Sequence, residues 1–319
     1  MKLLDLVITP GDPDGIGPEV TAKALDALGP ELKRFSVVIV GSSKPFARYK
    51  NILKSRDVCF FEPPERSSPG YQAGWSIETA TQFVMAAPKS RILVTGPISK
   101  ERLQLGGYFF KGHTDFLADL TRTRDVTMML ANDIFKVSLV TNHCSIADVP
   151  MKTTSIRIQK TLSHSYAFAK DFLAKKTPRI AVLGLNPHAG ENGILGKEEK
   201  KIIIPAMKAF SKRYPDAKLT GPHPADGFFA TELALPANKR HDVIVAMYHD
   251  QGLIPVKLSD FSNSLNITLG LPIIRTSVDH GTAFNIAKKN KANPSSMIYA
   301  IRKAIFYQAR ASRLRSNHS

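Results

Sequence analysis

Short runs of β-branched and other apolar residues alternate along this chain with longer stretches of helical periodicity, and this alternation limits its fold more than any other feature. The helical stretches cover residues 18–28, 77–87, 155–176 and 197–213 and a segment near the C-terminus. Such alternation is typical of a parallel α/β fold, and strands that are apolar throughout favour a sheet covered on both faces. Six runs are expected to be strands: LDLVIT (4–9), FSVVIVG (35–41), SRILVTG (90–96), FKVSLVT (135–141), PRIAVLGL (178–185) and HDVIVAMY (241–248).

The length of the chain suggests two domains. At roughly 150 residues per domain, a chain of 319 residues accommodates two, each with a core of its own. We expect two α/β domains: the first is discontinuous and comprises residues 1–125 and 276–319, and the second comprises residues 126–275. The segment FFEPPERSSPGYQAG at 60–74 is rich in Pro, Gly and Ser and is expected to be a surface loop.

Targeting segments and cysteines indicate a cytoplasmic protein. No run approaches the ~20 apolar residues that span a bilayer, and Asp5 interrupts the apolar stretch at the N-terminus. We therefore expect no membrane span and no signal peptide. The two cysteines, Cys59 and Cys144, are too few for a disulfide framework and fit a reducing compartment.

The charge is strongly basic and unevenly distributed. With 44 Lys and Arg against 27 Asp and Glu the formal net charge is +17, and residues 281–319 carry eight basic residues and no acidic one. Such a tail could contact nucleic acid or an acidic lipid. The helical spacing of Ile298, Ile301, Ile305 and Phe306 instead favours a helix docked on the core. We expect no nucleic-acid partner and no membrane partner.

Three of the expected strands run directly into a histidine: His143, His188 and His249. Because ligands bind at the carboxyl ends of the strands in open α/β sheets, all three imidazoles are expected on one edge. Neutral imidazole is a common ligand of divalent ions, and three histidines leave coordination positions open for a substrate. We predict a divalent-metal site there. Cys144, beside His143, could be a fourth ligand, but strand alternation favours a small buried residue that points away.

Two glycine-rich turns each connect a strand to a helix. VITPGDPDGIGPEV places Gly11, Gly15 and Gly17 before a helix, and VTGPISKERL places Gly96 before Lys100. The first spacing is not the dinucleotide pattern G-x-G-x-x-G, so a standard Rossmann site is not predicted. Lys100 near a helix start suits an anion, although both segments are also explained as tight turns.

Basic and polar donors gather in two further regions that we expect to be loops. The residues are Lys111, His113 and Thr114 in the first region, and Lys257, Asn266 and Arg275 in the second. Ammonium, imidazole, guanidinium and hydroxyl groups are the donors that bind oxyanions. Each residue alone is also explained as a surface residue, but together, in so basic a chain, they favour a small phosphorylated ligand.

Several blocks of the sequence resemble a known family. GDPDGIGPEV and DHGTAFNIA are similar to the paired motifs of the isopropylmalate and isocitrate dehydrogenase class. The match is closer to the 4-hydroxythreonine-4-phosphate dehydrogenase family of vitamin B6 biosynthesis, whose blocks occur here in the family's order and nearly end to end. These blocks are TGPISK, GHTDFL, GLNPHAGENG, GPHPAD, MYHDQGLIPVK and NITLGLPIIRTSVDHGTA.

The resemblance implies a fold and a set of site residues. The family has two α/β domains of the isopropylmalate dehydrogenase type with the active site in the cleft between them. It is homodimeric, with a shared active site in which one metal histidine, matching His249, comes from the partner chain. The second domain would thus carry the metal ligands and the dimer interface. The implied residues are His143, His188 and His249 for the metal, His113, Thr114, Lys257, Asn266 and Arg275 for the substrate, and Asp279, His280, Gly281, Thr282 and Ala283 for the adenosine half of NAD or NADP.

The resemblance also implies a reaction. NAD or NADP and one divalent ion (Zn²⁺, Mg²⁺, Co²⁺ or Mn²⁺) would serve the oxidation of a small phosphorylated hydroxy amino acid, 4-phosphohydroxy-L-threonine, at its C3 hydroxyl. The product, 2-amino-3-oxo-4-phosphooxybutanoate, would lose CO2 to give 3-amino-2-oxopropyl phosphate, on the way to pyridoxal 5′-phosphate. Asp250, Lys257 and Asp226 are the candidate proton acceptors, and Asp250 can instead orient a metal-bound imidazole.

Three departures from the family pattern leave other activities open. Gly227 follows the block GPHPAD where the family has a hydroxyl residue, Ser99 stands where some members have His, and Asp14 stands where Ala or Asn is frequent. They leave room for a 4-phospho-D-threonate or erythronate dehydrogenase of the same family. A zinc hydrolase, in which three histidines activate water, is a remote alternative, because it leaves the HGTA segment and both glycine turns unused.

Overall fold

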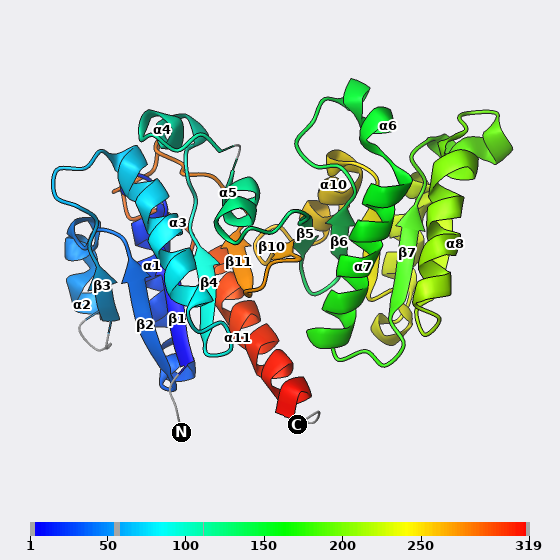
Figure 1. Cartoon of the computed structure of the whole chain (residues 1–319). Coiled ribbons are helices and arrows are strands. Elements are labelled where there is room, and N and C mark those ends of the chain that lie inside the picture. The colour runs from blue at the N-terminus through cyan, green and yellow to red at the C-terminus, as the bar shows by residue number, and fades with distance from the viewer. Residues whose placement is uncertain (1–3, 54–57, 111, 317–319) are drawn as a thin grey trace. The chain divides into compact units, whose positions relative to one another are not determined.

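The computed structural model describes residues 4–53, 58–110 and 112–316 of the chain, without the side chains of 52 and 313–316. The chain divides into two compact units, one of Met1–Val126 with Leu271–Ser312 and one built on Thr127–Gly270. Each unit has strands and helices of its own (Figure 1). The α/β class expected from the alternating runs is confirmed.

The described part of the first unit contains five parallel strands in the order β3-β2-β1-β4-β11. The last of them comes from the C-terminal part of the chain, so this unit is discontinuous. The strands are β1 (Leu4–Thr9), β2 (Phe35–Val40), β3 (Val58–Phe61), β4 (Arg91–Thr95) and β11 (Arg275–Val278).

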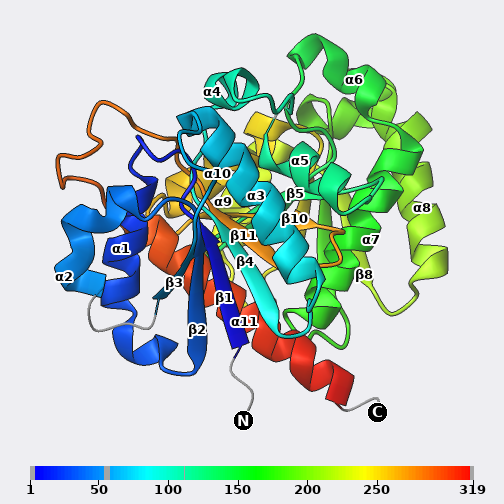
Figure 2. The ribbon, with the colours of Figure 1, turned by 60° about the vertical axis from the view of Figure 1, so that its left-hand side comes forward.

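Helices cover both faces of these strands. The helical segments are α1 (Gly17–Ala27), α2 (Lys50–Leu53), α3 (Pro69–Met85), α4 (Lys100–Leu105), α5 (His113–Leu120) and α11 (Ser295–Ser316), with short 3-10 segments η1 (Gly29–Leu32) and η2 (Lys44–Tyr49). Helix α3 packs on β1, β2 and β4, and Figure 2 shows α3 in front of the strands and α11 behind them. The expected docking of the C-terminal helix is confirmed, but its buried face is centred on Met297, Ile301 and Ala304, whereas Phe306 is 40% exposed.

The prediction of a surface loop over residues 60–74 is wrong at both ends. β3 ends within it at Phe61, and α3 begins within it at Pro69. The Ser68 hydroxyl accepts a hydrogen bond from Tyr71 N–H at 3.2 Å, and Pro69 occupies the first turn, so Ser and Pro here start a helix. A Cβ on Gly70 would lie 1.7 Å from the Arg102 backbone oxygen, so this glycine permits close packing of α3 on α4.

The second unit contains strands in the order β10-β5-β6-β9-β7-β8. β6, β9, β7 and β8 are parallel, but β5 is antiparallel to both β10 and β6. The expectation of a parallel sheet is therefore wrong for β5, because a short turn at Asn132–Phe135 joins it directly to β6. The strands are β5 (Thr127–Ala131), β6 (Lys136–Leu139), β7 (Arg179–Leu183), β8 (Lys218–His223), β9 (Val243–Ala246) and β10 (Leu265–Leu269).

Two hydrophobic clusters lie on opposite faces of these strands, which confirms for this unit the expected covering of both faces. Alternate residues divide between them: Val182 and Val245 pack with α7 and α8, whereas Ala181 and Ile244 pack with α9 and α10. The helical segments are α6 (Val149–Lys152), α7 (Ser155–Asp171), α8 (Ile204–Arg213), α9 (Ala225–Ala234) and α10 (His249–Ser259), with η3 (Ile146–Asp148), η4 (Pro187–Gly193), the π-helical η5 (Glu199–Ile203) and η6 (Ala237–Lys239).

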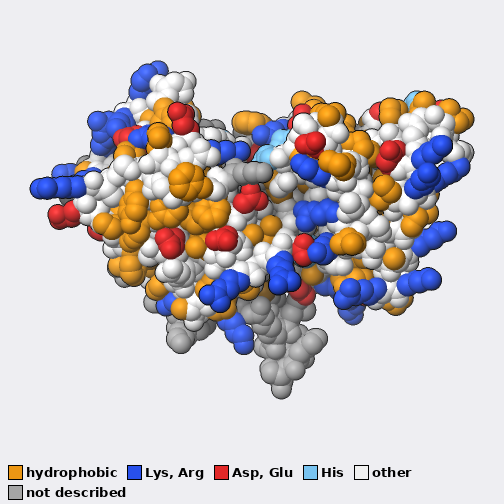
Figure 3. All heavy atoms as spheres, turned by 45° about the horizontal axis from the view of Figure 1, so that its top comes forward, with side chains coloured by type: hydrophobic (Ala, Val, Ile, Leu, Met, Phe, Trp, Pro, Cys, Tyr) orange, Lys and Arg blue, Asp and Glu red, His pale blue; other side chains and the backbone are white. Residues whose placement is uncertain are grey.

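The described helices and surface bear on two further expectations. None of these helices combines the length and the apolar character that crossing a bilayer requires. On the face shown in Figure 3, Lys and Arg side chains are scattered among acidic, apolar and other side chains. The basic charge on this face therefore does not form one continuous stripe.

Candidate active site

Three neighbouring parallel strands carry the three histidines to one edge of the second unit. β9 lies between β6 and β7, and the chain leaves β6, β7 and β9 toward His143, His188 and His249. This topology agrees with the expectation that the three histidines follow the carboxyl ends of strands at one edge of a sheet. The strand order, which places β9 between the other two, was not predicted.

His143 and His249 line one cavity of about 240 Å³. Their ring centroids lie 5.6 Å apart. Cys144 and Asp250 line the same cavity, so the expectation that Cys144 is a buried residue pointing away is wrong. The reason is that β6 has ended before it, and Cys144 N–H donates to the Asn142 oxygen at 2.9 Å in a turn, where strand alternation no longer applies.

His188 does not line that cavity. It is exposed and has a left-handed backbone with φ of 50°, in a segment where Ala189, Glu191 and Asn192 also have positive φ. Among the described residues, no group of three His, Cys, Asp or Glu side chains is placed to hold a metal ion. A single chain therefore brings two of the three predicted metal histidines together.

The backbone around His188 is held by a carboxylate that the sequence did not reveal. Glu199, almost fully buried, accepts hydrogen bonds from Leu185 N–H and Asn186 N–H, both at 2.8 Å, and from the Asn186 amide at 2.9 Å. The sequence around it, KEEKK, is typical of a solvated helix face. Nothing in the sequence therefore indicated that Glu199 is buried and accepts hydrogen bonds from the backbone. Glu199 fixes the start of the segment that presents His188.

Gln251 joins the ends of two histidine-bearing strands. Its side-chain oxygen accepts from Met247 N–H, and its amide donates to the Gly184 oxygen, each at 2.7 Å. These contacts connect the chain after β9 to the chain after β7. Beside it, His249 Nδ1 is 2.6 Å from Asp250 Oδ1, a contact that suits the tautomer with the proton on Nδ1 and the lone pair on Nε2.

The remaining predicted residues of the second unit lie on regular elements and not in loops. Lys257 is half-buried in α10 with its ammonium 5.7 Å from the Phe261 ring centroid, Asn266 lies in β10, and Asp226 is exposed in the first turn of α9. The Asn266 side-chain oxygen is buried and has no hydrogen-bond partner among the described residues. Such an unsatisfied atom is costly unless a ligand or water completes it.

In the first unit a buried arginine lies close to a neutral histidine. Arg275 is 2% exposed in β11, and its Nε and Nη2 donate to the Thr95 hydroxyl at 3.0 and 2.6 Å. Burial lowers the pKa of Arg275 to about 9. Burial, and then the charge of Arg275, lower the pKa of His113 well below its usual value. His113 Nε2 is buried with no partner among the described residues.

Other predicted anion ligands lie near His113. His113 and Thr114 open α5, and a Cβ on Gly112 would lie 3.9 Å from the Lys100 side chain, so Lys100 reaches the start of this helix. Lys111 lies outside the described residues. Ser99 caps α4 by accepting from Arg102 N–H at 3.3 Å, which gives this departure from the family pattern a structural role.

The two glycine-rich turns of the first unit pack on each other. Asp12 N–H donates to the Pro97 oxygen at 2.9 Å, and a Cβ on Gly11 or Gly96 would lie 2.0 or 2.4 Å from backbone oxygens of the opposite turn. Gly11 also has φ of 81°. These glycines are required for close approach of two backbones, in agreement with the simpler interpretation as tight turns.

The first glycine turn also contacts the HGTA segment. Ile16 N–H donates to the Thr282 oxygen at 2.9 Å, and a Cβ on Gly15 would lie 2.9 Å from that oxygen. Nearby, His280 Nε2 is buried without a partner among the described residues, and a Cβ on Gly281 would meet nothing within 4 Å. An unsatisfied buried nitrogen and free space beside two packed loops fit a bound dinucleotide.

Comparison with known proteins decides the family. The model for the pyridoxal phosphate biosynthetic protein PdxA matches residues 34–304. The chain belongs to the PdxA family. A 4-hydroxythreonine-4-phosphate dehydrogenase of Desulfosudis oleivorans is 40% identical over 325 residues, covering 93% of this chain and 94% of its own. A D-threonate 4-phosphate dehydrogenase of Pectobacterium atrosepticum is 39% identical, covering 94% of this chain and 98% of its own.

A solved PdxA-family structure agrees with the fold. The 4-hydroxythreonine-4-phosphate dehydrogenase of Klebsiella pneumoniae superposes with a TM-score of 0.80 at 35% identity, covering 96% of this chain and 99% of its own. The resemblance stated from the sequence blocks is confirmed, and so is the expectation of an oxidoreductase of the dehydrogenase type. Asp14, a departure from the PdxA pattern, is bonded to Arg102 at 2.7 Å and to Lys288 at 3.0 Å.

Proposed function

We propose that this member of the PdxA family oxidises 4-phosphohydroxy-L-threonine with NAD or NADP in pyridoxal 5′-phosphate biosynthesis. The product 2-amino-3-oxo-4-phosphooxybutanoate then decarboxylates to 3-amino-2-oxopropyl phosphate. The observation that carries the proposal is the delivery of three histidines to one edge by β6, β9 and β7. When bound, a divalent ion lowers the pKa of the substrate hydroxyl and the dinucleotide accepts the hydride.

The metal would be held by His143, His188 and His249. Imidazole nitrogen suits Zn²⁺, Co²⁺ or Mn²⁺, and the open positions suit a substrate hydroxyl. Two of these side chains share a cavity in one chain, with centroids 5.6 Å apart. Metal content after dialysis is the direct test: His188→Ala is expected to lose most of its bound metal and its turnover, and full retention of both would contradict the assignment.

The phosphate and carboxylate of the substrate would be bound by His113, Thr114, Lys257, Asn266 and Arg275. The buried cation Arg275 and the unsatisfied atoms His113 Nε2 and Asn266 Oδ1 support this role. A neutral His113 donates one hydrogen bond without adding a second buried charge beside Arg275. Arg275→Lys is expected to raise KM for the phosphorylated substrate, because the ammonium cannot reproduce the planar fork of donors.

Asp250 would position His249, since its carboxylate accepts the Nδ1 proton at 2.6 Å. The proton of the substrate hydroxyl would then pass to Lys257 or Asp226. Loss of a general base lowers kcat by about 10²–10⁴. We expect the variant that removes the base, either Lys257→Met or Asp226→Asn, to have a lower kcat than the other variant by that factor at saturating substrate and metal. Two variants that are both as active as the wild type would exclude both residues.

Asp279, His280, Gly281, Thr282 and Ala283 would line the adenosine half of the dinucleotide. The free space at Gly281 and the unsatisfied His280 Nε2 support this. Titration of tryptophan or reduced-dinucleotide fluorescence with NADH and NADPH measures the binding without turnover. Gly281→Val is expected to weaken both cofactors while leaving the melting temperature within a few degrees.

We further propose a homodimer with a shared active site, because one chain brings together only two of the metal histidines. Exposed apolar side chains near the cavity support an interface there: Ile146, Met151 and Ile156 are 69%, 74% and 67% exposed. Coexpression of His143→Ala and His249→Ala chains tests it. If His249 completes the site of the partner chain, the mixed dimer regains one intact site and part of the activity. Inactive mixed dimers would place His143 and His249 in the same site, as the shared cavity of one chain does, and coexpression of His143→Ala with His188→Ala chains would then test whether His188 comes from the partner.

A second candidate function is the oxidation of 4-phospho-D-threonate or erythronate. A Cβ on Gly227, next to Asp226, would meet nothing within 4 Å, so the place of the family's hydroxyl residue is open space here. A relative with the threonate activity is 39% identical. A panel of the three phosphorylated substrates with both dinucleotides separates the candidates by kcat/KM. Absence of any reduced dinucleotide, with metal-dependent ester hydrolysis instead, would favour a zinc hydrolase.

A further inference from the structure

Arg102 of α4 holds two carboxylates of the first glycine turn at once. Its Nη1 donates to Asp12 Oδ1 at 3.0 Å, and its Nη2 donates to Asp14 Oδ2 at 2.7 Å. Asp14 N–H also donates to Asp12 Oδ1 at 3.0 Å. The planar fork of a guanidinium holds two acceptors in a fixed relative position, which the point charge of an ammonium does not. Arg102 therefore fixes residues 12–14 against the helix that follows the second glycine turn.

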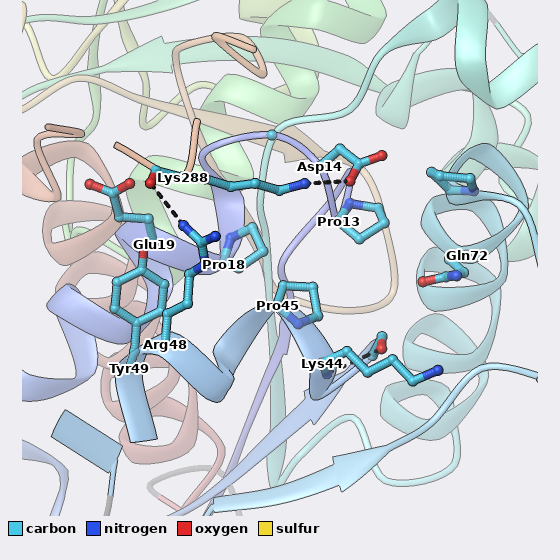
Figure 4. A pocket seen from close by; sticks show the side chains of 13 residues that line it. Pro13, Asp14, Pro18, Glu19, Lys44, Pro45, Arg48, Tyr49, Gln72 and Lys288 are labelled. Atoms are coloured by element: carbon cyan, nitrogen blue, oxygen red, sulfur yellow. Dashed lines mark hydrogen bonds and ion pairs between the residues drawn. The ribbon is translucent and has the colours of Figure 1, made fainter. Parts of the chain in front are cut away.

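Asp14 continues these contacts to the segment after HGTA. Its other oxygen, Oδ1, lies 3.0 Å from the Lys288 ammonium, and Figure 4 shows Lys288 extended toward it. The hydrogen bond from Arg102, together with that from Lys288, lowers the pKa of Asp14 below its usual value. Arg102 also lies over the Phe284 ring, with its guanidinium carbon 5.2 Å from the ring centroid. One carboxylate is thus shared by cations of two segments that are remote in the sequence.

Lys288 is held in a backbone conformation that lysine rarely adopts. Its φ is 64°, and Ala283 and Asn290 also have positive φ, of 42° and 58°. Such conformations cost free energy and persist where surrounding contacts fix them. For Lys288 these contacts are the pair with Asp14 and a hydrogen bond of 3.0 Å from Arg48 to its backbone oxygen, both drawn in Figure 4. The segment after HGTA is therefore fixed through a side chain and through its backbone.

The two halves of this network differ in burial. Asp12 is 1% exposed, and burial raises its pKa, while the hydrogen bond from Asp14 N–H and the charge of Arg102 oppose that rise. A buried carboxylate that loses its cation is costly, so the contact of Arg102 with Asp12 is the stronger one. The side chains of Asp14 and Lys288 are 42% and 56% exposed, and salt screens a pair of this kind.

The linked segments are those that meet at the proposed adenosine site. Ile16 N–H donates to the Thr282 oxygen at 2.9 Å, and Asp14 precedes this contact in the sequence while Lys288 follows it. A dinucleotide that binds to both segments requires them to keep one relative position. Loops that already have this position bind more tightly, because less conformational freedom is lost on binding.

We infer that Arg102, Asp14 and Lys288 form an ionic clamp that positions the first glycine turn and the segment after HGTA for the dinucleotide. This inference rests on the proposed dehydrogenase function. The three residues are positioning residues, because they act through the backbone that they hold. The alternative is a direct action of their charges on the anionic dinucleotide. Loss of the Asp14 charge separates the two, since it would strengthen a direct attraction but opens the clamp and so weakens binding.

The test is titration of the full chain with a reduced dinucleotide, followed by its fluorescence in the absence of substrate. The probe is NADH or NADPH, whichever the wild type binds more tightly. Asp14→Asn is expected to weaken binding about threefold, and this loss should shrink at high salt. Arg102→Met is expected to weaken binding about tenfold, and adding Asp14→Asn to it should cost nothing more, because both changes open the same clamp.

Asp5→Asn is the matched control. Asp5 pairs with Arg91 at 2.8 Å in the same unit, at the start of β1 and β4 and so at the opposite edge of the strands. The change removes one carboxylate charge from an Asp–Arg pair, as Asp14→Asn does. We expect a similar melting temperature for the two variants, with the dinucleotide affinity of Asp5→Asn unchanged.

The kinetic counterpart is the division of the effect between KM and kcat. In Asp14→Asn, KM for the dinucleotide should rise by the same factor as its dissociation constant. The value of kcat at saturating dinucleotide, KM for the phosphorylated substrate and the metal affinity should stay unchanged. Unchanged or tighter dinucleotide binding in Asp14→Asn would overturn the inference, as would an equal loss in Asp5→Asn or a fall in kcat with KM unchanged.

The two proposals fail in different ways. Substrate oxidation by the wild type, with full dinucleotide affinity in Asp14→Asn, leaves the function standing and removes the inference. Weaker dinucleotide binding in Asp14→Asn, with no oxidation of any phosphorylated substrate by the wild type, removes the function and leaves the ionic clamp standing.

Discussion

The backbone N–H of Ile16 donates a hydrogen bond of 2.9 Å to the backbone oxygen of Thr282, two residues far apart in the sequence. This contact joins the N-terminal glycine turn to the HGTA segment. Each segment is recognisable as a motif by itself, and the structure shows that they form one surface within the first unit. A dinucleotide bound to one of them therefore depends on the geometry of the other.

Gly15→Ala should disturb that contact. The new Cβ would lie 2.9 Å from the Thr282 oxygen and 3.1 Å from the Thr282 Cβ, distances at which the backbone must shift. Overpacking of this kind lowers the free energy of unfolding by about 1–3 kcal/mol. We expect weaker dinucleotide binding with metal affinity unchanged, measured by separate titrations.

Gly227→Ala is the matched control for stability. Its Cβ would meet nothing within 4 Å, and the residue lies in α9, so the change should raise the free energy of unfolding by up to about 1 kcal/mol. If Gly15→Ala melts like the wild type and binds the dinucleotide equally well, the contact has no role in cofactor binding.

Glu199→Gln should loosen the segment that presents His188. The Glu199 carboxylate accepts three hydrogen bonds from Leu185 and Asn186. A glutamine side chain replaces one of the two acceptor oxygens with an NH₂ group, so at least one of these N–H groups would face another donor. Loss of a supporting partner of this kind costs about 10–100-fold in metal affinity. Competition with a chelator measures this affinity. Glu198→Gln, which alters one contact to the Asn186 amide at 2.8 Å, should have the smaller effect, and the reverse order would refute the assignment.

The pKa of His113 predicts acid sensitivity of the metal-free protein. Because the folded state holds the pKa of His113 well below the usual value, only the unfolded chain binds this proton as the pH falls through about 6.5. The contribution to stability is complete above that pH and decreases below it, by up to about 1.4 kcal/mol per pH unit. Urea midpoints at several pH values, with a chelator present, measure the slope.

His113→Gln should make that slope shallower, whatever it does to the absolute stability. His223, whose pKa burial also lowers, provides the comparison: His223→Gln should remove a smaller part of the slope. An unchanged slope in His113→Gln would mean that this imidazole is protonated in the folded state.

The sequence predicted the elements that are apolar and regular, and missed those stabilised by specific polar contacts. All six expected strands exist, but β11 was missed because Arg275, Thr276 and Ser277 look unlike a buried strand. Their polar groups are satisfied inside the protein, for example Arg275 by the Thr95 hydroxyl and Thr276 by the Ala300 oxygen. Strands β3, β5, β8 and β10 were missed as well, and β5 was missed although it is buried along its whole length.

The site shows the same division. Parallel topology was enough to place three histidines at one edge, since strand ends follow from the pattern alone. The supporting contacts of Glu199 and Gln251 depend on partners that are remote in the chain or in the backbone, and no local pattern reveals them. For the same reason the sequence could not show that His188 lies outside the cavity of His143 and His249.

Asp250→Asn separates a positioning role from a role in proton transfer. Asparagine keeps the shape of the side chain and can still accept the Nδ1 proton of His249, but it loses the charge that strengthens this 2.6 Å bond. If Asp250 positions the imidazole, we expect metal affinity to fall about tenfold, with kcat restored by excess metal and the pH profile unchanged. If it accepts the substrate proton, kcat falls by about 10²–10⁴ at saturating metal, and the acidic limb of the profile disappears. Asp226→Asn, measured in parallel, distinguishes the two carboxylates, because Asp226 is exposed at the start of α9 and supports none of the histidines.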